Sequence, residues 1–246
     1  MEFTKIRELL AENASLDELD FDIGQGRVSD GCHFMLRGEP SIDFKLESSF
    51  FRDKRYKSIS FEKYYGKYNY RDEEFDSGLL LANCGIIYFD TDNKNLLNFP
   101  QFPGTMISQH SGKYRTPLLD VSYHIFAPIY FACKTYKDKN GKDLYSNTDG
   151  RIYRFREKTG SLDVKKPFSE FIINCSIPTP HDRMMKQDGE FIATFVIKDG
   201  KSYFSDISKS RNLYIDEYII PKDEKEKFIK MLEAKFGNDL DSHFGF

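Results

Sequence analysis

The chain has 246 residues, of which 15% are aromatic and 30% charged, and its formal net charge is -3 at pH 7. This length allows one large domain with a sizeable core, and the composition argues against a largely disordered chain. Because the net charge is close to zero, nucleic-acid binding would need a local basic groove. The four cysteines form no C-x-x-C pair, which favours buried, reduced thiols over a zinc knuckle. Without an apolar leader or a run of about 18 apolar residues, we expect a cytoplasmic protein with no membrane partner.

The first part of the chain predicts a short helix near residues 4–10 and then a β-hairpin over residues 30–47. The turn is expected at Gly38-Glu39-Pro40. Side chains alternate between the two faces of a strand, so two sets are expected on opposite faces of the second strand. Its polar face would carry Asp43, Lys45 and Glu47, and its packed face Ile42, Phe44 and Leu46.

A basic segment follows this hairpin. Six cationic residues are interleaved with five tyrosines: Arg52, Lys54, Arg55, Lys57, Lys63 and Lys67. Lysine and arginine neutralise phosphates, and tyrosine rings stack on unpaired bases. The segment therefore predicts contact with nucleic acid, against the alternative of a solvated loop whose aromatic residues turn into the core.

The middle of the chain predicts further hairpins and a long strand. Residues 79–89 are an apolar run that ends in a polar turn, and residues 95–99 resume as a strand. Residues 121–136 predict the long strand. Asn140-Gly141 and Asp199-Gly200 are each flanked by strand-like residues, as in two-residue hairpin loops that require positive φ.

The last part of the chain predicts strands and one helix. Three segments have the alternating or apolar character of strands: residues 151–156, 171–177 and 212–220. A helix is predicted over residues 222–236, with Gly237 as its stop signal. We expect the tail from residue 238 onward to fray.

About ten strands and three or four helices, without regular strand–helix alternation, predict an α+β fold. We expect a mixed, mainly antiparallel sheet with a few flanking helices. If the chain divides, the predicted division is a core over residues 1–136 and a hairpin-rich part with the C-terminal helix over residues 137–246. A single compact domain is the alternative.

The predicted hairpin carries the main functional pattern. Asp30 opens its first strand, and Asp43 and Lys45 lie two residues apart on its second strand. This arrangement resembles the PD-(D/E)xK nuclease superfamily, in which two acids hold Mg²⁺ and a lysine steadies the attacked phosphate or the attacking water. The resemblance implies a metal-dependent endonuclease whose catalytic residues are Asp30, Asp43 and Lys45. Mg²⁺ or Mn²⁺ would be the cofactor, DNA or RNA the partner, residues 1–136 the nuclease core, and Glu47 a further metal ligand.

The chain departs from that pattern in two ways. Ser29 stands where the superfamily has a proline. The acids face each other only if the turn is centred near Leu36 and Arg37, whereas the predicted turn at Gly38 leaves them roughly 7 to 13 Å out of register along a strand. A β-bulge would recover part of this offset.

Two alternatives remain. Asp90 and Asp92 end an apolar strand, and His124 lies 32 residues later in another, which is similar to the archaeo-eukaryotic primase pattern of two metal-binding acids and a nucleotide-contacting histidine. That reading would make the protein a primase or polymerase. The other alternative is a non-enzymatic module that binds nucleic acid or protein through its basic and aromatic surface.

Overall fold

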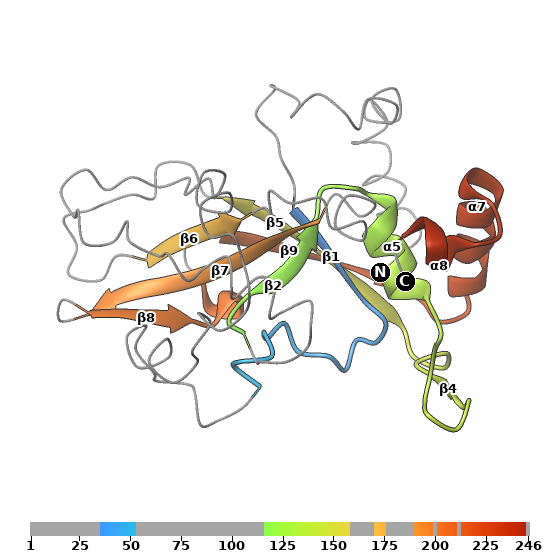
Figure 1. The fold of residues 1–246 in the computed structure, drawn as a ribbon, viewed down its shortest axis with the longest axis horizontal. Helices are drawn as coiled ribbons and strands as arrows, with labels where there is room; N and C mark the ends of the chain where they lie inside the picture. Colours follow the sequence, from blue (N-terminus) through green and yellow to red (C-terminus); the bar gives the residue numbers. More distant parts are fainter. Residues whose placement is uncertain are drawn as a thin grey trace, which may run out of the picture.

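The computed structural model describes residues 35–52, 116–157, 170–175, 189–198, 201–210 and 213–244. Within these ranges the chain is α+β and its main element is a seven-stranded sheet, ordered β6-β7-β2-β1-β5-β9 with β8 paired to β7 (Figure 1). Every strand pair in the described residues is antiparallel. The strands are β1 (Met35–Glu39), β2 (Leu119–Ser122), β5 (Gly150–Glu157), β6 (Glu170–Cys175), β7 (Gly189–Lys198), β8 (Lys201–Ser205) and β9 (Leu213–Ile220).

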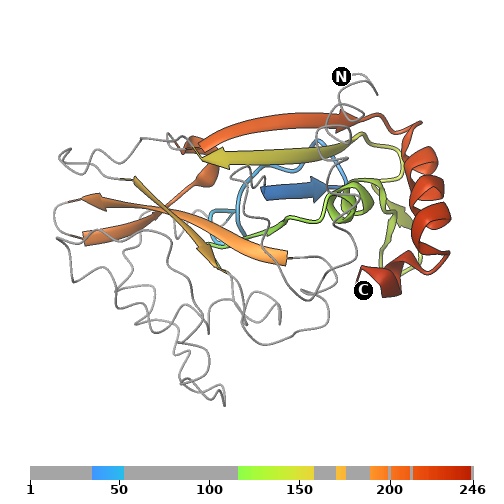
Figure 2. The same cartoon turned by 90° about the horizontal axis from the view of Figure 1, so that it is seen from above.

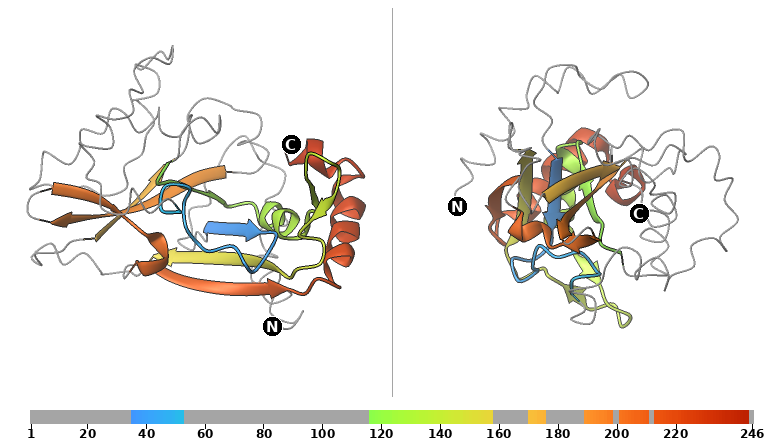
Figure 3. Two further views of the ribbon diagram at one scale, coloured as in Figure 1. Left: turned by 90° about the horizontal axis from the view of Figure 1, so that it is seen from below. Right: turned by 90° about the vertical axis from the view of Figure 1, so that its left-hand side faces the viewer.

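The helices α5 (Phe126–Cys133), α7 (Lys225–Phe236) and α8 (Leu240–His243) gather at one end of the sheet, as the views from above and below show (Figures 2 and 3). They bury an apolar core against one face of the strands, which we call the helix face. Its strand residues include Leu36, Ile152, Tyr218 and Ile220. Among the described residues, no helix is both long enough and apolar enough to cross a membrane.

The second half of the chain confirms most sequence predictions. Strands β5, β6 and β9 occupy the predicted segments, and Lys198 pairs with Lys201 across the predicted two-residue connection of β7 and β8. The hairpin of β3 (Tyr136–Lys137) and β4 (Asp143–Leu144) also forms, with Gly141 at φ 78°. Its connection is five residues long rather than two, because the Asp138 carboxylate accepts hydrogen bonds from two backbone N–H groups of the loop.

Helix α7 ends at Gly237 as predicted, with φ of 90° and its N–H donating to the Glu233 carbonyl. The predicted fraying after residue 238 is wrong. Leu240 and Phe244 lie one helical turn apart and are both buried in α8 and its end. The Asp241 carboxylate accepts hydrogen bonds from Tyr130 of α5 and from Lys134, which directly follows that helix, and these bonds tie α8 to the core.

The predicted strand over residues 121–136 is also wrong. Strand β2 ends at Ser122, whose Oγ accepts the His124 N–H at 3.0 Å, and α5 begins at Phe126. Seven of the eight residues of α5 are buried, so its sequence shows no polar face. A short apolar run of this kind has no periodicity that distinguishes a buried helix from a strand.

The predicted turn at Gly38-Glu39-Pro40 is the third correction. Gly38 and Glu39 belong to β1, which pairs with β5 on one side and β2 on the other, and residues 41–47 form turns rather than a strand. Gly38 serves close packing instead of a turn: a Cβ there would lie 2.0 Å from the Pro128 carbonyl oxygen of α5. A glycine allows such an approach of two backbones because it has no side chain.

Strands β2 and β1 lie between β7 and β5, so the sheet combines elements from before and after residue 137. The boundary between residues 136 and 137 remains a prediction. Cys133 is a free, buried thiol in α5, and burial raises its pKa to about 12. For this cysteine the expectation of a buried, reduced thiol is met.

We expect Gly38→Ala to destabilise the fold by about 3 kcal/mol, because the new methyl group would force α5 away from β1. The control is Gly141→Ala, where open space surrounds the Cβ position and only the positive φ is unfavourable, at about 1 kcal/mol. Urea unfolding of both variants measures the difference. Equal destabilisation of the two would contradict the proposed close contact.

Candidate functional site

The face of the sheet opposite α5 carries a polar cluster beside its apolar core. We call this the loop face, because residues 41–50 run across it. Arg37 of β1 is largely buried there, with its Nε donating to Glu39 Oε1 at 2.7 Å and an Nη donating to the Asp120 carbonyl at 2.8 Å. Burial opposes the charge of Arg37, but the carboxylates of Glu39 and Asp120 outweigh it, and the pKa of Arg37 is raised.

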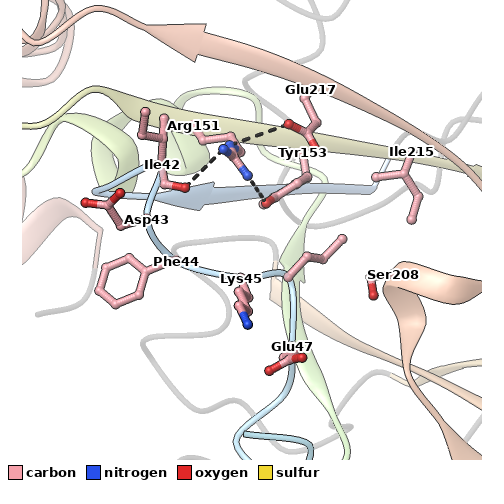
Figure 4. A pocket seen from close by; sticks show the side chains of 11 residues that line it. Ile42, Asp43, Phe44, Lys45, Glu47, Arg151, Tyr153, Ser208, Ile215 and Glu217 are labelled. Atoms are coloured by element: carbon pink, nitrogen blue, oxygen red, sulfur yellow. Dashed lines mark hydrogen bonds and ion pairs between the residues drawn. The ribbon is translucent and has the colours of Figure 1, made fainter.

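A cavity of about 490 Å³ lies next to this cluster, between the loop and strands β5 and β9 (Figure 4). The loop forms one wall, and the short helix η4 (Ile207–Lys209) contributes Ser208. The cavity residues are Ile42, Asp43, Phe44, Lys45, Leu46, Glu47, Arg151, Tyr153, Ser208, Ile215 and Glu217.

Arg151 joins the two walls of the cavity. One Nη donates to the Tyr153 hydroxyl at 2.6 Å and the other to the Ile42 carbonyl at 3.0 Å. Its Nε is buried, has no hydrogen-bond partner in the described part of the chain, and lies 3.6 Å from Glu217 Oε2. This guanidinium therefore fixes the start of the loop while it adds positive charge to the cavity.

Tyr153 lies at the centre of the polar cluster, because it pairs with Arg37 on one side and Glu217 on the other. It is 1% exposed. Burial raises the pKa of its hydroxyl, and the hydrogen bond and charge of Arg151 oppose that rise. Tyr153 thus stays a neutral hydrogen-bonding group at ordinary pH.

The structure brings three predicted site residues to this cavity: Asp43, Lys45 and Glu47. Asp43 and Lys45 are exposed, Phe44 and Glu47 are half-buried and Leu46 is buried. The predicted separation onto two strand faces is not found, because the segment forms turns and both sets of side chains line the same cavity. Ile42 also differs from the prediction, since it is exposed rather than packed. The Asp43 N–H donates to Ser41 Oγ at 3.1 Å, which holds this part of the loop in a turn.

Among the described residues, no group of three His, Cys, Asp or Glu side chains is placed to hold a metal ion. In Figure 4 the Asp43 carboxylate lies at one end of the loop segment, and Lys45 and Glu47 lie further along it. Asp30 lies outside the described residues, so the predicted pair of Asp30 and Asp43 remains a prediction.

Arg52 is exposed, and its Nε donates to the Glu47 carbonyl at 3.1 Å. The other cations of the predicted nucleic-acid-binding segment lie outside the described residues: Lys54, Arg55, Lys57, Lys63 and Lys67.

His124, the histidine of the primase alternative, contacts the start of α5 and neighbouring aromatic rings. Its Nδ1 accepts the Ala127 N–H at 3.3 Å at the start of α5, and its ring packs against Phe126, Phe236 and Phe244. Asp90 and Asp92 lie outside the described residues. His124 therefore accepts a hydrogen bond from the first turn of α5 while its ring packs within an aromatic cluster.

Sequence reasoning did not select Arg151, Tyr153 or Glu217. The only available signal was the alternation of charged and aromatic residues in the segment that became β5. Arg151 reaches the loop across 109 residues of sequence, and local spacing does not reveal such a contact.

The comparisons with known proteins give one match. Residues 32–141 match the FRG domain. This segment, less than half of the chain, includes β1, the loop, β2 and α5, whereas Arg151, Tyr153 and Glu217 lie beyond it. No curated protein and no solved structure matches the chain.

We expect Arg151→Gln to raise the pKa of Tyr153 further, because the substitution removes the positive charge that opposes the effect of burial. NMR titration of ¹³Cζ-labelled tyrosines, with Tyr153→Phe for assignment, measures this pKa. Arg156→Gln is the control, since Arg156 lies on the same strand but on the opposite face. An unchanged or lowered pKa in Arg151→Gln would contradict the described network.

Proposed function

We propose that the protein is a metal-dependent endonuclease that hydrolyses phosphodiester bonds of DNA or RNA at the loop-face cavity. The main support is that Asp43, Lys45 and Glu47 line the same cavity as Arg151 and Tyr153. Acids, cations and a buried hydroxyl at one concave site are the groups that phosphodiester hydrolysis uses.

The residues would divide the work by their charge and position. Lys45 is exposed and can place its ammonium against a phosphate, where it offsets the negative charge that develops during attack. Arg151 is fixed by two hydrogen bonds, so its guanidinium adds a preorganised positive charge at little cost in side-chain entropy. Arg52 and the basic segment after it would bind the phosphates of the nucleic-acid backbone.

Mg²⁺ or Mn²⁺ is the cofactor that we propose. Mg²⁺ commonly binds one or two carboxylates and takes its other ligands from water and substrate phosphate. Asp43 and Glu47 provide carboxylates at the cavity, and Asp30 would be a further ligand. When bound, the metal would lower the pKa of a coordinated water and neutralise phosphate charge.

We expect Asp43→Asn to reduce cleavage at least 100-fold without changing thermal unfolding, because Asp43 is exposed and loses only its charge. The assay uses labelled single- and double-stranded DNA and RNA with Mg²⁺ or with EDTA. The control is Asp223→Asn, an exposed acid before α7 that should cleave like the wild type. Undiminished cleavage by Asp43→Asn, or cleavage that persists in EDTA, would reject the proposed role.

A second candidate is a binding module without catalysis. It is favoured by the fact that no three potential ligands converge on a metal position within the described residues. This candidate expects nucleic acid to be bound equally with Mg²⁺ and EDTA and to remain uncut, so the same assay separates the two functions.

A further inference from the structure

Lys225, the first residue of α7, has a buried amine. The residue is 5% exposed, and its Nζ donates to the Pro40 carbonyl at 2.7 Å and to the Tyr145 carbonyl at 3.0 Å. Within the described ranges no carboxylate forms an ion pair with this nitrogen. Burial lowers the pKa of Lys225, but both protonation states of an amine carry at least two N–H groups, so the two hydrogen bonds do not depend on pH. Most buried lysines pair with an acid, whereas this one holds two pieces of backbone.

The two carbonyls belong to segments that border the loop-face cavity. Pro40 directly precedes the part of the loop that forms one wall of the cavity. The ring of Tyr145 lies edge-on to the ring of Phe44 in that wall, with 5.0 Å between the ring centres. The Thr148 hydroxyl lies 3.3 Å from the Pro40 oxygen and 3.2 Å from the Tyr145 oxygen. Lys225 and Thr148 thus hold the same two carbonyls together.

Tyr145 has a backbone conformation that needs such support. Its φ is 63°, in the left-handed region, which is unfavourable for a residue with a side chain. Its carbonyl accepts from Lys225 at 3.0 Å, and the hydroxyl and the N–H of Thr148 lie at 3.2 and 3.5 Å. Lys225 therefore provides the shortest hydrogen bond that holds this turn.

The next residues of the loop are held by the same part of the chain. The Ile42 N–H donates to the Asp149 carbonyl at 2.9 Å, and Asp149 Oδ1 accepts the Lys222 N–H at 2.9 Å. Lys222 lies in the segment that leads into α7. In Figure 4, Asp43 and Phe44 project from the loop beside Ile42. The position of these two side chains therefore depends on where α7 begins.

We propose that Lys225 is a positioning residue for the loop-face cavity: it fixes the start of the loop, and the loop carries Asp43 to the cavity. Its effect on cleavage rests on the proposed function, whereas its hold on the loop does not. Because Lys225 is buried, it would contribute to turnover rather than to contact with the substrate. A purely structural lysine would instead stabilise the whole fold and would affect the loop no more than the strands.

Amide hydrogen exchange of the full chain, followed by NMR, tests the hold on the loop. Lys225→Met keeps the length of the side chain and removes its donors. We expect it to speed exchange of the Ile42 and Phe44 amides about 10-fold more than that of the β5 and β9 amides, because a loop can open without unfolding of the sheet. The control is Lys227→Met, which removes an exposed lysine of the same helix and should exchange like the wild type. Equal acceleration in the loop and in the strands, or none in the loop, would overturn the proposal.

Thr148→Val provides a second variant that leaves Lys225 in place. It removes the hydroxyl beside the same two carbonyls, so it should speed exchange of the same loop amides to a smaller extent. This variant decides the question if Lys225→Met does not fold, and loop amides that exchange at the wild-type rate would again count against the proposal.

The cleavage assay with Mg²⁺ tests the catalytic consequence at a temperature where the variants are folded. We expect Lys225→Met to lower kcat about 5-fold and to change KM less than about 2-fold, because the lysine does not touch the substrate. An unchanged kcat in a variant whose loop amides exchange faster would overturn the positioning role, as would a rise in KM alone. A wild-type chain that cuts nothing would reject the nuclease proposal, and the exchange rates would still decide whether Lys225 holds the loop.

Discussion

The contact on which the rest of the structure depends is the backbone of α5 against two glycines. A Cβ at Gly38 would lie 2.0 Å from the Pro128 carbonyl oxygen, and one at Gly150 would lie 2.3 Å from the Ala132 carbonyl oxygen. Residues 128 and 132 are one helical turn apart, so a single face of the helix rests on two adjacent strands. Because this contact fixes β1 against β5, it also fixes what those strands project on the opposite face. The polar cluster around Arg37 therefore depends on two residues that have no side chain.

The two faces of β5 and β9 show how one pair of strands can serve different purposes. Alternate residues point to opposite sides, so Arg151 and Tyr153 meet the loop while Arg154 and Arg156 meet Asp216. On the loop face the guanidinium is enclosed and its hydrogen bonds go to protein groups. On the helix face, beyond the end of the helices, both guanidinium groups contact the same oxygen, Asp216 Oδ2.

The parts of the fold that could be predicted are those whose sequence pattern is compatible with only one local structure. Residues 151–156 alternate in type and lie within β5, and Gly237 ends α7 because positive φ is costly for other residues. Gly38 has two possible uses, a turn or a close contact, and only the position of α5 decides between them. The sequence grouped Asp43, Lys45 and Glu47 through their spacing of two, but they meet in a turn segment rather than on one face of a strand. The contribution of Arg151 depends on a contact 109 residues away in sequence, which local spacing does not reveal.

The position of Asp43 illustrates why the distant residues matter to the site. Its neighbour Ile42 is held at both backbone groups: the N–H donates to the Asp149 carbonyl at 2.9 Å, and the carbonyl accepts from Arg151 at 3.0 Å. Asp43 itself is exposed and its contacts are to Ser41: its N–H donates to Ser41 Oγ at 3.1 Å, and its Oδ2 accepts from the same hydroxyl at 3.3 Å. A catalytic carboxylate must be held within a fraction of an ångström to be effective. The two hydrogen bonds of Ile42 fix the backbone from which Asp43 projects. Under the proposed function, Arg151 would therefore help to position the acid as well as to attract phosphate.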